Sequence, residues 1–183
     1  MIRCWESNDP LYNSYHDEEW GRPVRDELGL YERLCLEGFQ SGLSWLTILR
    51  KRDAFREAFE GFDPERVSEF GEHDVERLLQ NPGIIRHRGK IEAAIANAQA
   101  TIALRGTTPL PELFWSFAPA QHAIPQTTAD WQASTPESVA LAKALRKAGF
   151  RFVGPTTVYA AMQACGVVDD HLATCFVRAS RPS

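Results

Sequence analysis

Four residues of the types that bind zinc lie near the two ends of the chain. Cys4 and His16 have eleven residues between them, and His171 and Cys175 have three. Two thiolates and two imidazoles suit a tetrahedral zinc ion, and such a set leaves no ligand position for water. The pattern therefore predicts one structural zinc per chain that joins the termini. The alternative is that the cysteines are buried apolar residues and His16 is a surface histidine, since no CxxC pair is present.

A second set combines aromatic rings with one carboxylate. Tyr12 and Tyr15 are three residues apart and share one face of a predicted helix, while Glu37 lies in an apolar stretch that ends at Trp45. Rings stack on flat ligands and attract cations, and a carboxylate accepts hydrogen bonds. We therefore expect a slot for a flat, positively charged ligand. The alternative is that the rings are core packing and Glu37 is a surface or capping carboxylate.

The segment 81–90 predicts a tight, basic turn between a short helix and a long one. Proline and glycine favour the turn, and the free N–H groups at the start of the next helix can bind a phosphate. This is the layout of a helix-hairpin-helix, which grips the DNA backbone without reading sequence. The residues expected to make this contact are Gly83, Ile85, Arg86, Arg88 and Lys90. The alternative is a basic turn that contacts only solvent.

A further basic cluster extends this surface or is simply the solvated face of a helix. It consists of Lys143, Arg146, Lys147 and Arg151.

The elements that position these residues are predicted to be helices. Asp9, Asp63 and Thr135 each precede a proline, which is typical of a capped helix start. Asp26 and Ser44 are further expected caps. Helices are expected over 74–80, 88–104, 136–148 and 155–165, with a short one near 114–117, and loops over 106–111 and 118–134. Only 150–153 has strand character, and one strand makes no sheet.

We therefore predict an all-α fold, a compact multi-helix bundle formed by one domain over 1–183. Its helix-hairpin-helix spans about 74–104, and the zinc-binding terminal segments are 4–16 and 171–175. The formal net charge of −4 excludes a general nucleic-acid coat but allows a local basic patch. The chain shows neither a signal sequence nor an apolar run of membrane-spanning length, so we expect a cytoplasmic protein with no membrane partner. Cys35 and Cys165 are expected in the core.

Several ordered segments together resemble the bacterial DNA-3-methyladenine glycosylase I family, within the helix-hairpin-helix glycosylase superfamily. The resemblance runs from residue 3 to about residue 175. The segments are Cys4, DPLY at 9–12, YHD at 15–17, EWG at 19–21, CLEG at 35–38, GLSW at 42–45, GIIRHRGKI at 83–91, WSF at 115–117, GF at 149–150, FVG at 152–154, MQACG at 162–166 and DH at 170–171.

The resemblance assigns roles to the candidate residues. It implies that Glu37 binds the damaged base and is the catalytic candidate, that Trp45 stacks on the base, and that Tyr12 and Tyr15 line the pocket. The segment of Gly42 and Leu43 matches the one that fills the gap left by a flipped nucleotide. The zinc ligands match Cys4, His16, His171 and Cys175. One departure is that Cys4 and Trp5 are adjacent, where the family often has an intervening residue, which shortens the first zinc spacing.

The implied activity is monofunctional base-excision repair, in which the enzyme flips out 3-methyladenine and hydrolyses its N-glycosyl bond. The expected partner is double-stranded DNA with alkylated bases, the expected product is free 3-methyladenine, and the expected state is a monomer. Two readings from other classes remain open: a non-catalytic helix-hairpin-helix DNA-binding module, and a zinc-stabilised helical protein that binds a purine.

Overall fold

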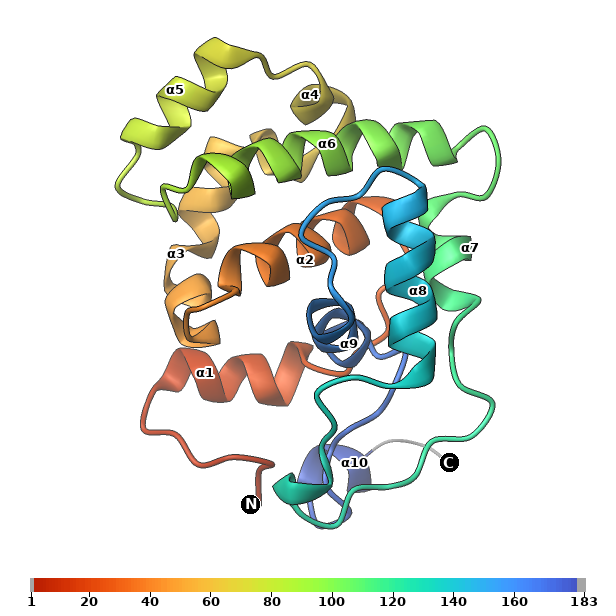
Figure 1. Cartoon of the computed structure of the whole chain (residues 1–183). Coiled ribbons are helices and arrows are strands. Elements are labelled where there is room, and N and C mark those ends of the chain that lie inside the picture. The colour runs from red at the N-terminus through yellow and green to blue at the C-terminus, as the bar shows by residue number, and fades with distance from the viewer. Residues whose placement is uncertain (1, 181–183) are drawn as a thin grey trace.

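The computed structural model describes residues 2–180, and within them the fold is all-helical (Figure 1). The α-helices are α1 (Pro10–Ser14), α2 (Glu27–Gln40), α3 (Trp45–Ala58), α4 (Pro64–Ser68), α5 (Glu72–Gln80), α6 (Arg88–Leu104), α7 (Leu110–Trp115), α8 (Pro136–Lys147), α9 (Pro155–Ala164) and α10 (Phe176–Ala179). A π-helix, Tyr15–Glu19, continues α1, and 3-10 turns occupy Glu60–Phe62 and Thr128–Asp130. No described helix is both long and apolar enough to cross a membrane.

The predicted helix starts are confirmed by their capping bonds. The side chains of Asp9, Asp26, Ser44, Asp63 and Thr135 each accept a hydrogen bond from a backbone N–H in the first turn of the following helix. These bonds satisfy donors that no helix can satisfy internally.

Most helix ends lie within one or two residues of the prediction, and α6 matches it fully. One expectation needs correction. The short helix α7 begins at Leu110, so the loop expected over 106–111 is shorter and the helix lies earlier in the chain. The segment 150–153 forms no strand, in agreement with the predicted all-α fold, since the described chain has no neighbouring strand to pair with it.

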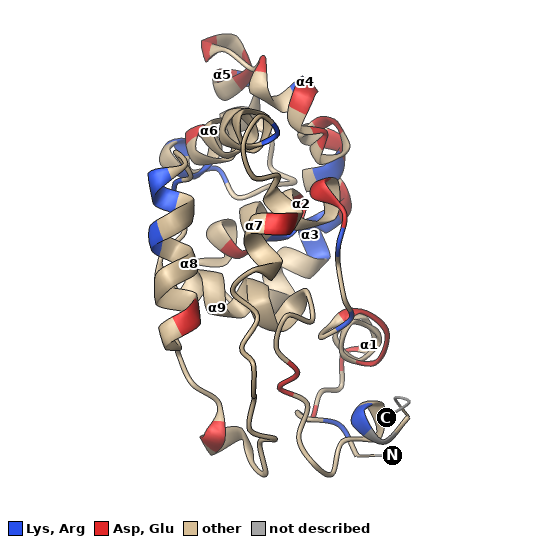
Figure 2. Ribbon diagram, turned by 90° about the vertical axis from the view of Figure 1, so that its right-hand side faces the viewer, with Lys and Arg blue, Asp and Glu red and all other residues tan. Residues whose placement is uncertain are grey.

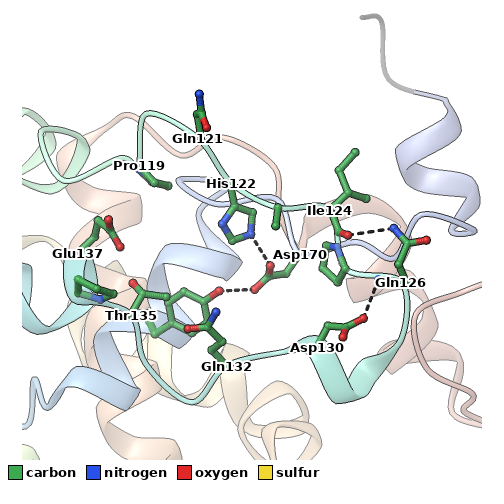
Figure 3. A pocket seen from close by; sticks show the side chains of 14 residues that line it. Pro119, Gln121, His122, Ile124, Gln126, Asp130, Gln132, Thr135, Glu137 and Asp170 are labelled. Carbon is green, nitrogen blue, oxygen red and sulfur yellow. Dashed lines mark hydrogen bonds and ion pairs between the residues drawn. The ribbon is translucent and has the colours of Figure 1, made fainter.

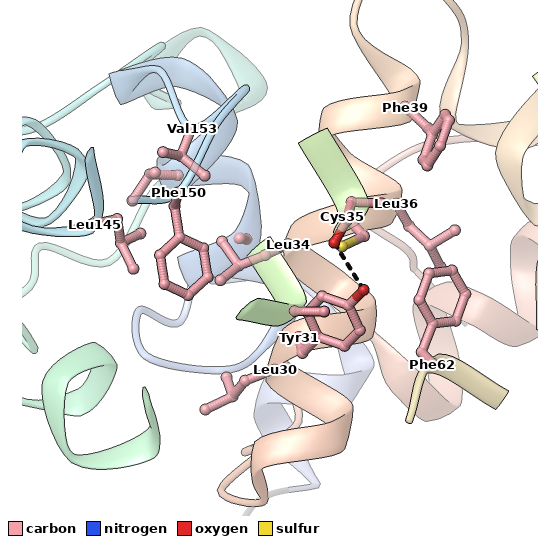
Figure 4. Packing of buried hydrophobic residues seen from close by; sticks show 14 of the residues in the cluster. Leu30, Tyr31, Leu34, Cys35, Leu36, Phe39, Phe62, Leu145, Phe150 and Val153 are labelled. Carbon is pink, nitrogen blue, oxygen red and sulfur yellow. Dashed lines mark hydrogen bonds between the residues drawn. The ribbon is translucent and has the colours of Figure 1, made fainter. Parts of the chain in front are cut away.

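Helix α2 lies at the centre of the bundle and supplies much of the core (Figures 1 and 4). It contacts α3, α6, α7 and α9. Tyr31, Leu34 and Phe39 are almost completely buried, and the Tyr31 hydroxyl donates to Ala94 O on α6 at 2.9 Å. Cys35 on this helix is also buried, as predicted, and so is Cys165. Because α2 is surrounded, Glu37 in its last turn is placed inside the molecule.

A second, smaller apolar cluster lies where the two ends of the chain meet. It includes Cys4, Tyr15, Trp20, Leu172 and Cys175. Figure 1 shows the N-terminal segment beside α10, and Phe176 N donates to Ile2 O at 3.0 Å. The predicted single domain also includes residues 1 and 181–183, which lie outside the described residues. The two termini thus pack together at one end of the bundle, next to the start of α3 and to α9.

Candidate functional site

The four residues expected to bind a flat ligand line one pocket of about 200 Å³. They are Tyr12, Tyr15, Glu37 and Trp45. The pocket also takes in Trp5 and Trp20, which flank the two tyrosines in the sequence, and four residues without a predicted role in it, namely Gln40, Trp131, Ala160 and Gln163. The lining therefore combines six aromatic rings with one carboxylate and two carboxamides. Such a cavity is smaller than those that hold drug-sized ligands, so its size suits a single base.

The π-helix at 15–19 explains how two neighbouring residues can both point inward. Tyr15 and His16 are both buried, with Tyr15 in the pocket and His16 in the cluster at the termini. The Tyr15 ring stacks on Tyr12 at 6.5 Å between centroids and 15° between planes, and it lies 5.5 Å from the Trp45 ring. Such an extra residue in a helical turn often marks a functional site, and no sequence pattern reveals it.

Glu37 is a buried carboxyl at the wall of the pocket, with 5% of the residue exposed. Burial raises its pKa to about 8, and the guanidinium of Arg33 acts in the opposite direction. Within the described residues, no donor forms a hydrogen bond with it. Its oxygens are therefore acceptors that a ligand in the pocket can satisfy.

Arg33 is a cation behind the rings of Tyr15 and Trp45, and it is not among the site residues predicted from the sequence. Its guanidinium carbon lies 5.5 Å from the Tyr15 ring centroid and 5.8 Å from that of Trp45, and Nη1 donates to the Tyr15 hydroxyl at 3.4 Å. Glu19 lies 3.7 Å from Arg33 and is itself held by Arg52 at 2.6 Å. The network fixes Tyr15 from behind and moderates the cost of burying Glu37.

The segment expected to fill the gap in DNA projects from the end of α2. Gly42 has a φ of +83°, a conformation that favours glycine, and the Leu43 residue is 40% exposed. Gln40 closes the loop, because its Nε2 donates to Leu43 O at 3.0 Å and its carbonyl accepts from Leu43 N at 2.7 Å. Since Gln40 also lines the pocket, the projecting loop and the pocket share one wall.

The predicted tight turn lies between α5 and α6. Asn81 Oδ1 accepts from Gly83 N at 2.8 Å, and Ile84 is buried beneath the turn. A Cβ on Gly83 would come within 2.9 Å of Ala54 Cβ, so only glycine fits against α3. The arrangement is a short helix, a turn and a long helix, as the sequence predicts.

The three basic residues of this turn differ in their surroundings. Arg86 is exposed, and no carboxylate of the described chain pairs with it. Arg88 forms ion pairs with Glu72 at 2.8 Å and with Glu76. Lys90 departs from the expectation, because its ammonium is buried and donates to Phe39 O at 2.9 Å and to Ser41 O at 2.6 Å.

Lys90 therefore does not face a phosphate in this structure. It binds carbonyl oxygens at the C-terminus of α2, where a cation is favoured by the helix dipole. The bond fixes the start of the projecting loop against the turn.

The additional basic cluster is exposed. Figure 2 shows basic residues gathered on the end of α8 that lies beside α6. Lys143, Arg146, Lys147 and Arg151 are all exposed and have no carboxylate partner among residues 2–180. The next residue, Phe152, is 43% exposed, has a φ of +55°, and lies 6.2 Å from the His87 ring. The cluster thus continues toward the turn that carries Arg86.

The termini bring together a set of potential metal ligands. Ligand atoms of Cys4, His16 and Cys175 lie within 4.8 Å of one another, and all three residues are buried. The sequence prediction joins these residues with His171, whose ring centroid lies 5.2 Å from that of His16.

His171 has a ring nitrogen that is available as a further metal ligand. Its Nε2 is buried without a hydrogen-bond partner. Its Nδ1 lies 2.8 Å from Asp169 Oδ1, and His16 Nδ1 lies 2.8 Å from Asp17 Oδ1. A carboxylate on Nδ1 is the usual partner of a metal-binding histidine, because it leaves Nε2 for the metal. Cys4, His16 and Cys175 could therefore hold a metal ion, and the unpartnered Nε2 of His171 belongs to a ring beside them.

The comparisons with known proteins agree with this geometry. A family model described as methyladenine glycosylase matches residues 5–178. The chain is 51% identical over 179 residues to DNA-3-methyladenine glycosylase 1 of Escherichia coli (strain K12), covering 96% of each chain. A crystal structure of 3-methyladenine DNA glycosylase I aligns with a TM-score of 0.93 at 51% identity, covering 99% of this chain and 100% of that one. A Staphylococcus aureus structure described as the basis of 3-methyladenine recognition aligns with a TM-score of 0.91 at 35% identity, covering 96% and 95%.

Proposed function

We infer that this chain, which belongs to the methyladenine glycosylase family, is a DNA-3-methyladenine glycosylase that removes the alkylated base from DNA by hydrolysis. The observation that supports this most strongly is the pocket, where Tyr12, Tyr15 and Trp45 surround the single buried carboxyl of Glu37. The family and the pocket therefore indicate the same ligand, a flat base with positive charge.

The chemistry requires recognition more than acid catalysis. Methylation at N3 makes the base cationic while it is attached to the sugar, so it leaves as a neutral molecule and the glycosidic bond is already weakened. The enzyme must extrude the base and hold it while water attacks C1′ of the sugar. We propose that Trp45 and Tyr15 stack on the extruded base and that Glu37 accepts a hydrogen bond from its exocyclic amino group.

We further propose that the reaction is monofunctional. A glycosylase that also cleaves the strand needs an amine nucleophile at the sugar. None of the ten residues that line the pocket is a lysine. The nearby Lys90 has its ammonium bound to two carbonyl oxygens, so it is not free to attack.

The proposed DNA contact is the turn between α5 and α6 together with the projecting loop. The N–H groups of Arg88 and Gly89 at the start of α6 have no acceptor within the described chain and are available to a phosphate. Arg86 adds an unpaired charge, and the basic end of α8 extends it. Leu43 would fill the space that the extruded nucleotide leaves. Since most of these contacts are to the backbone, they supply affinity without reading sequence.

The proposed cofactor is one structural zinc held by Cys4, His16, His171 and Cys175. The support is the buried, unpartnered Nε2 of His171 beside a group of three other ligands. Four protein ligands leave no position for a reacting water, so the ion would stabilise the fold. The rings of Trp5 and Trp20 each lie 4.6 Å from one of the two histidines, which links this site to the pocket wall.

The proposed setting follows from the substrate. Chromosomal DNA is in the cytoplasm of a bacterium, and the matched relatives are bacterial. A protein that contacts a duplex with one face needs no second copy, so we propose a monomer.

Two experiments separate this function from the alternatives. A thermal-shift titration with free 3-methyladenine should raise the melting temperature, since a ligand that binds only the folded state stabilises it. A purely DNA-binding module would show no such shift. Incubation with methylated duplex should release the base and leave intact strands with abasic sites, whereas a purine-binding protein would release nothing.

A further inference from the structure

Asp170 is a buried carboxylate that organises three side chains behind the base pocket. Figure 3 shows Asp170 beside His122 in the wall of a neighbouring cavity. The Tyr159 hydroxyl and Gln163 Nε2 donate to its Oδ2 at 2.7 and 2.6 Å, and His122 Nε2 lies 2.6 Å from its Oδ1. A larger cavity of about 420 Å³ lies beside Asp170 and is lined by the loop before α8. No tryptophan lines that cavity, so it lacks the stacking surfaces of the base pocket. Its wall matters because Asp170 lies there and binds Gln163 of the base pocket.

Gln163 connects Asp170 to the base pocket. It lies on α9 and is part of the pocket lining. A carboxamide has one donor end and one acceptor end. Since the carboxylate of Asp170 already accepts from Tyr159, a flipped amide would place its oxygen against another acceptor. The hydrogen-bond network therefore assigns Nε2 to Asp170 and leaves Oε1 as the free polar atom of Gln163.

We propose that Gln163 is a specificity-determining residue whose Oε1 accepts a hydrogen bond from the bound base, and that Asp170 is the positioning residue that holds it in this orientation. This inference rests on the proposed function of the pocket. With Glu37 ionised by the cationic base, Glu37 and Gln163 both present acceptors to it. This pair favours an adenine-type base, which offers an amino group, over a guanine-type base, which presents a carbonyl oxygen at the same ring position.

The substitution Gln163→Met tests the acceptor, because methionine keeps a similar length and removes the amide. The substrates are duplexes that contain 3-methyladenine or 3-methylguanine, which share the methyl position and the positive charge. We expect single-turnover release of 3-methyladenine to fall about 10- to 100-fold, the effect of losing one buried hydrogen bond. Release of 3-methylguanine should change much less, so the ratio between the two rates falls.

A double-mutant cycle tests the role of Asp170. Asp170→Asn no longer imposes one orientation on the amide, so it should lower the same ratio in the wild-type background. In the Gln163→Met background it should leave the ratio unchanged, since its effect passes through Gln163. A role limited to stability would lower both rates alike in both backgrounds. Melting temperature and zinc content of each variant identify any loss of folded protein.

The outcomes are separable. If wild-type protein releases no 3-methyladenine, the proposed function fails. If wild-type protein is active and Gln163→Met leaves the ratio of the two rates unchanged, the specificity role of Gln163 is overturned while the proposed function stands. If Asp170→Asn lowers the ratio equally in both backgrounds, the positioning role of Asp170 is overturned.

Discussion

The burial of Glu37 should lower the free energy of unfolding of the protein at neutral and alkaline pH. The carboxyl is buried, no residue among 2–180 donates a hydrogen bond to it, and burial raises its pKa to about 8. A group whose folded-state pKa lies above its unfolded value binds a proton that unfolding releases, so the free energy of unfolding falls as pH rises toward 8. The wild-type protein should therefore become less stable as pH rises over this range.

The substitution Glu37→Gln should remove that loss. We expect the variant to melt higher than wild type, with a difference that is small at pH 5 and grows up to about pH 8, because each pKa unit is worth about 1.4 kcal/mol. Calorimetry across this range measures the difference. A difference that shrinks as pH rises would show that Glu37 is stabilised as a carboxylate by some other group.

The same residue predicts the pH dependence of the reaction. In the proposed mechanism the ionised form of Glu37 accepts the hydrogen bond from the base, so kcat/KM should rise with pH, with a midpoint near pH 8, the pKa in the free protein, and level off above it. Glu37→Gln should give a lower profile that is flat over this range. A rising profile in Glu37→Gln would assign the titration to another group.

At this scale the sequence predicts residues whose chemistry is distinctive by type, and misses those placed by the fold. Glu37 stands out as an acid in an apolar stretch. Arg33 does not, because an arginine on a helix is ordinary until its ring contacts are known. Trp131 and Gln163 reach the pocket from segments remote in sequence, and only tertiary packing brings them there.

At the scale of elements, the turn between α5 and α6 contains basic residues that serve different purposes. Arg86 is exposed and unpaired within the described chain, whereas Lys90 binds the carbonyl oxygens of Phe39 and Ser41. Their spacing from the turn gave no means of telling them apart. The distinction depends on the end of α2, which meets α6 at Lys90.

The substitution Arg86→Glu should weaken binding to damaged and undamaged duplexes by the same factor and reduce the salt dependence of binding, because it removes a backbone contact. Titrations at several salt concentrations measure this. Arg66→Glu is the control for net charge, with the same change of charge at an exposed arginine on α4, which pairs with Glu60. Equal effects of the two variants would show that Arg86 acts only through the net charge of the protein and does not contact DNA.

The substitution Lys90→Met should act on stability instead. It leaves two carbonyl oxygens at the end of α2 without their donor, which costs about 1–3 kcal/mol in the free energy of unfolding. Denaturant unfolding measures the loss. If Lys90→Met folds as stably as wild type but loses DNA affinity, Lys90 contacts phosphate after all, as the sequence analysis expected.

At the scale of the whole molecule, the helices could be predicted because their caps are local. The π-helix could not, since its extra residue becomes visible only when Tyr15 and His16 are both seen to be buried. The meeting of the termini was predicted from ligand types alone. Their geometry depends on packing, because Asp17 and Asp169 orient the two histidines.

The proposed zinc should contribute to the stability of the entire fold. Purified protein should contain one zinc per chain, and Cys175→Ser should lower both the zinc content and the melting temperature, because the metal closes a loop over nearly the whole chain. Cys35→Ser is the control, since Cys35 is also buried but lies outside the metal group. Full zinc occupancy in Cys175→Ser would remove Cys175 from the ligand set.

We propose that the pocket of Glu37 and Trp45 is where this chain removes 3-methyladenine from DNA. The most direct test is single-turnover release of 3-methyladenine from methylated duplex by wild type, Glu37→Gln and Trp45→Ala. We expect release by wild type, and in each variant a barrier higher by about 1–3 kcal/mol, with affinity for undamaged duplex little changed. Release at the wild-type rate in both variants would place the base-binding site elsewhere, and no release by wild type would contradict the function itself.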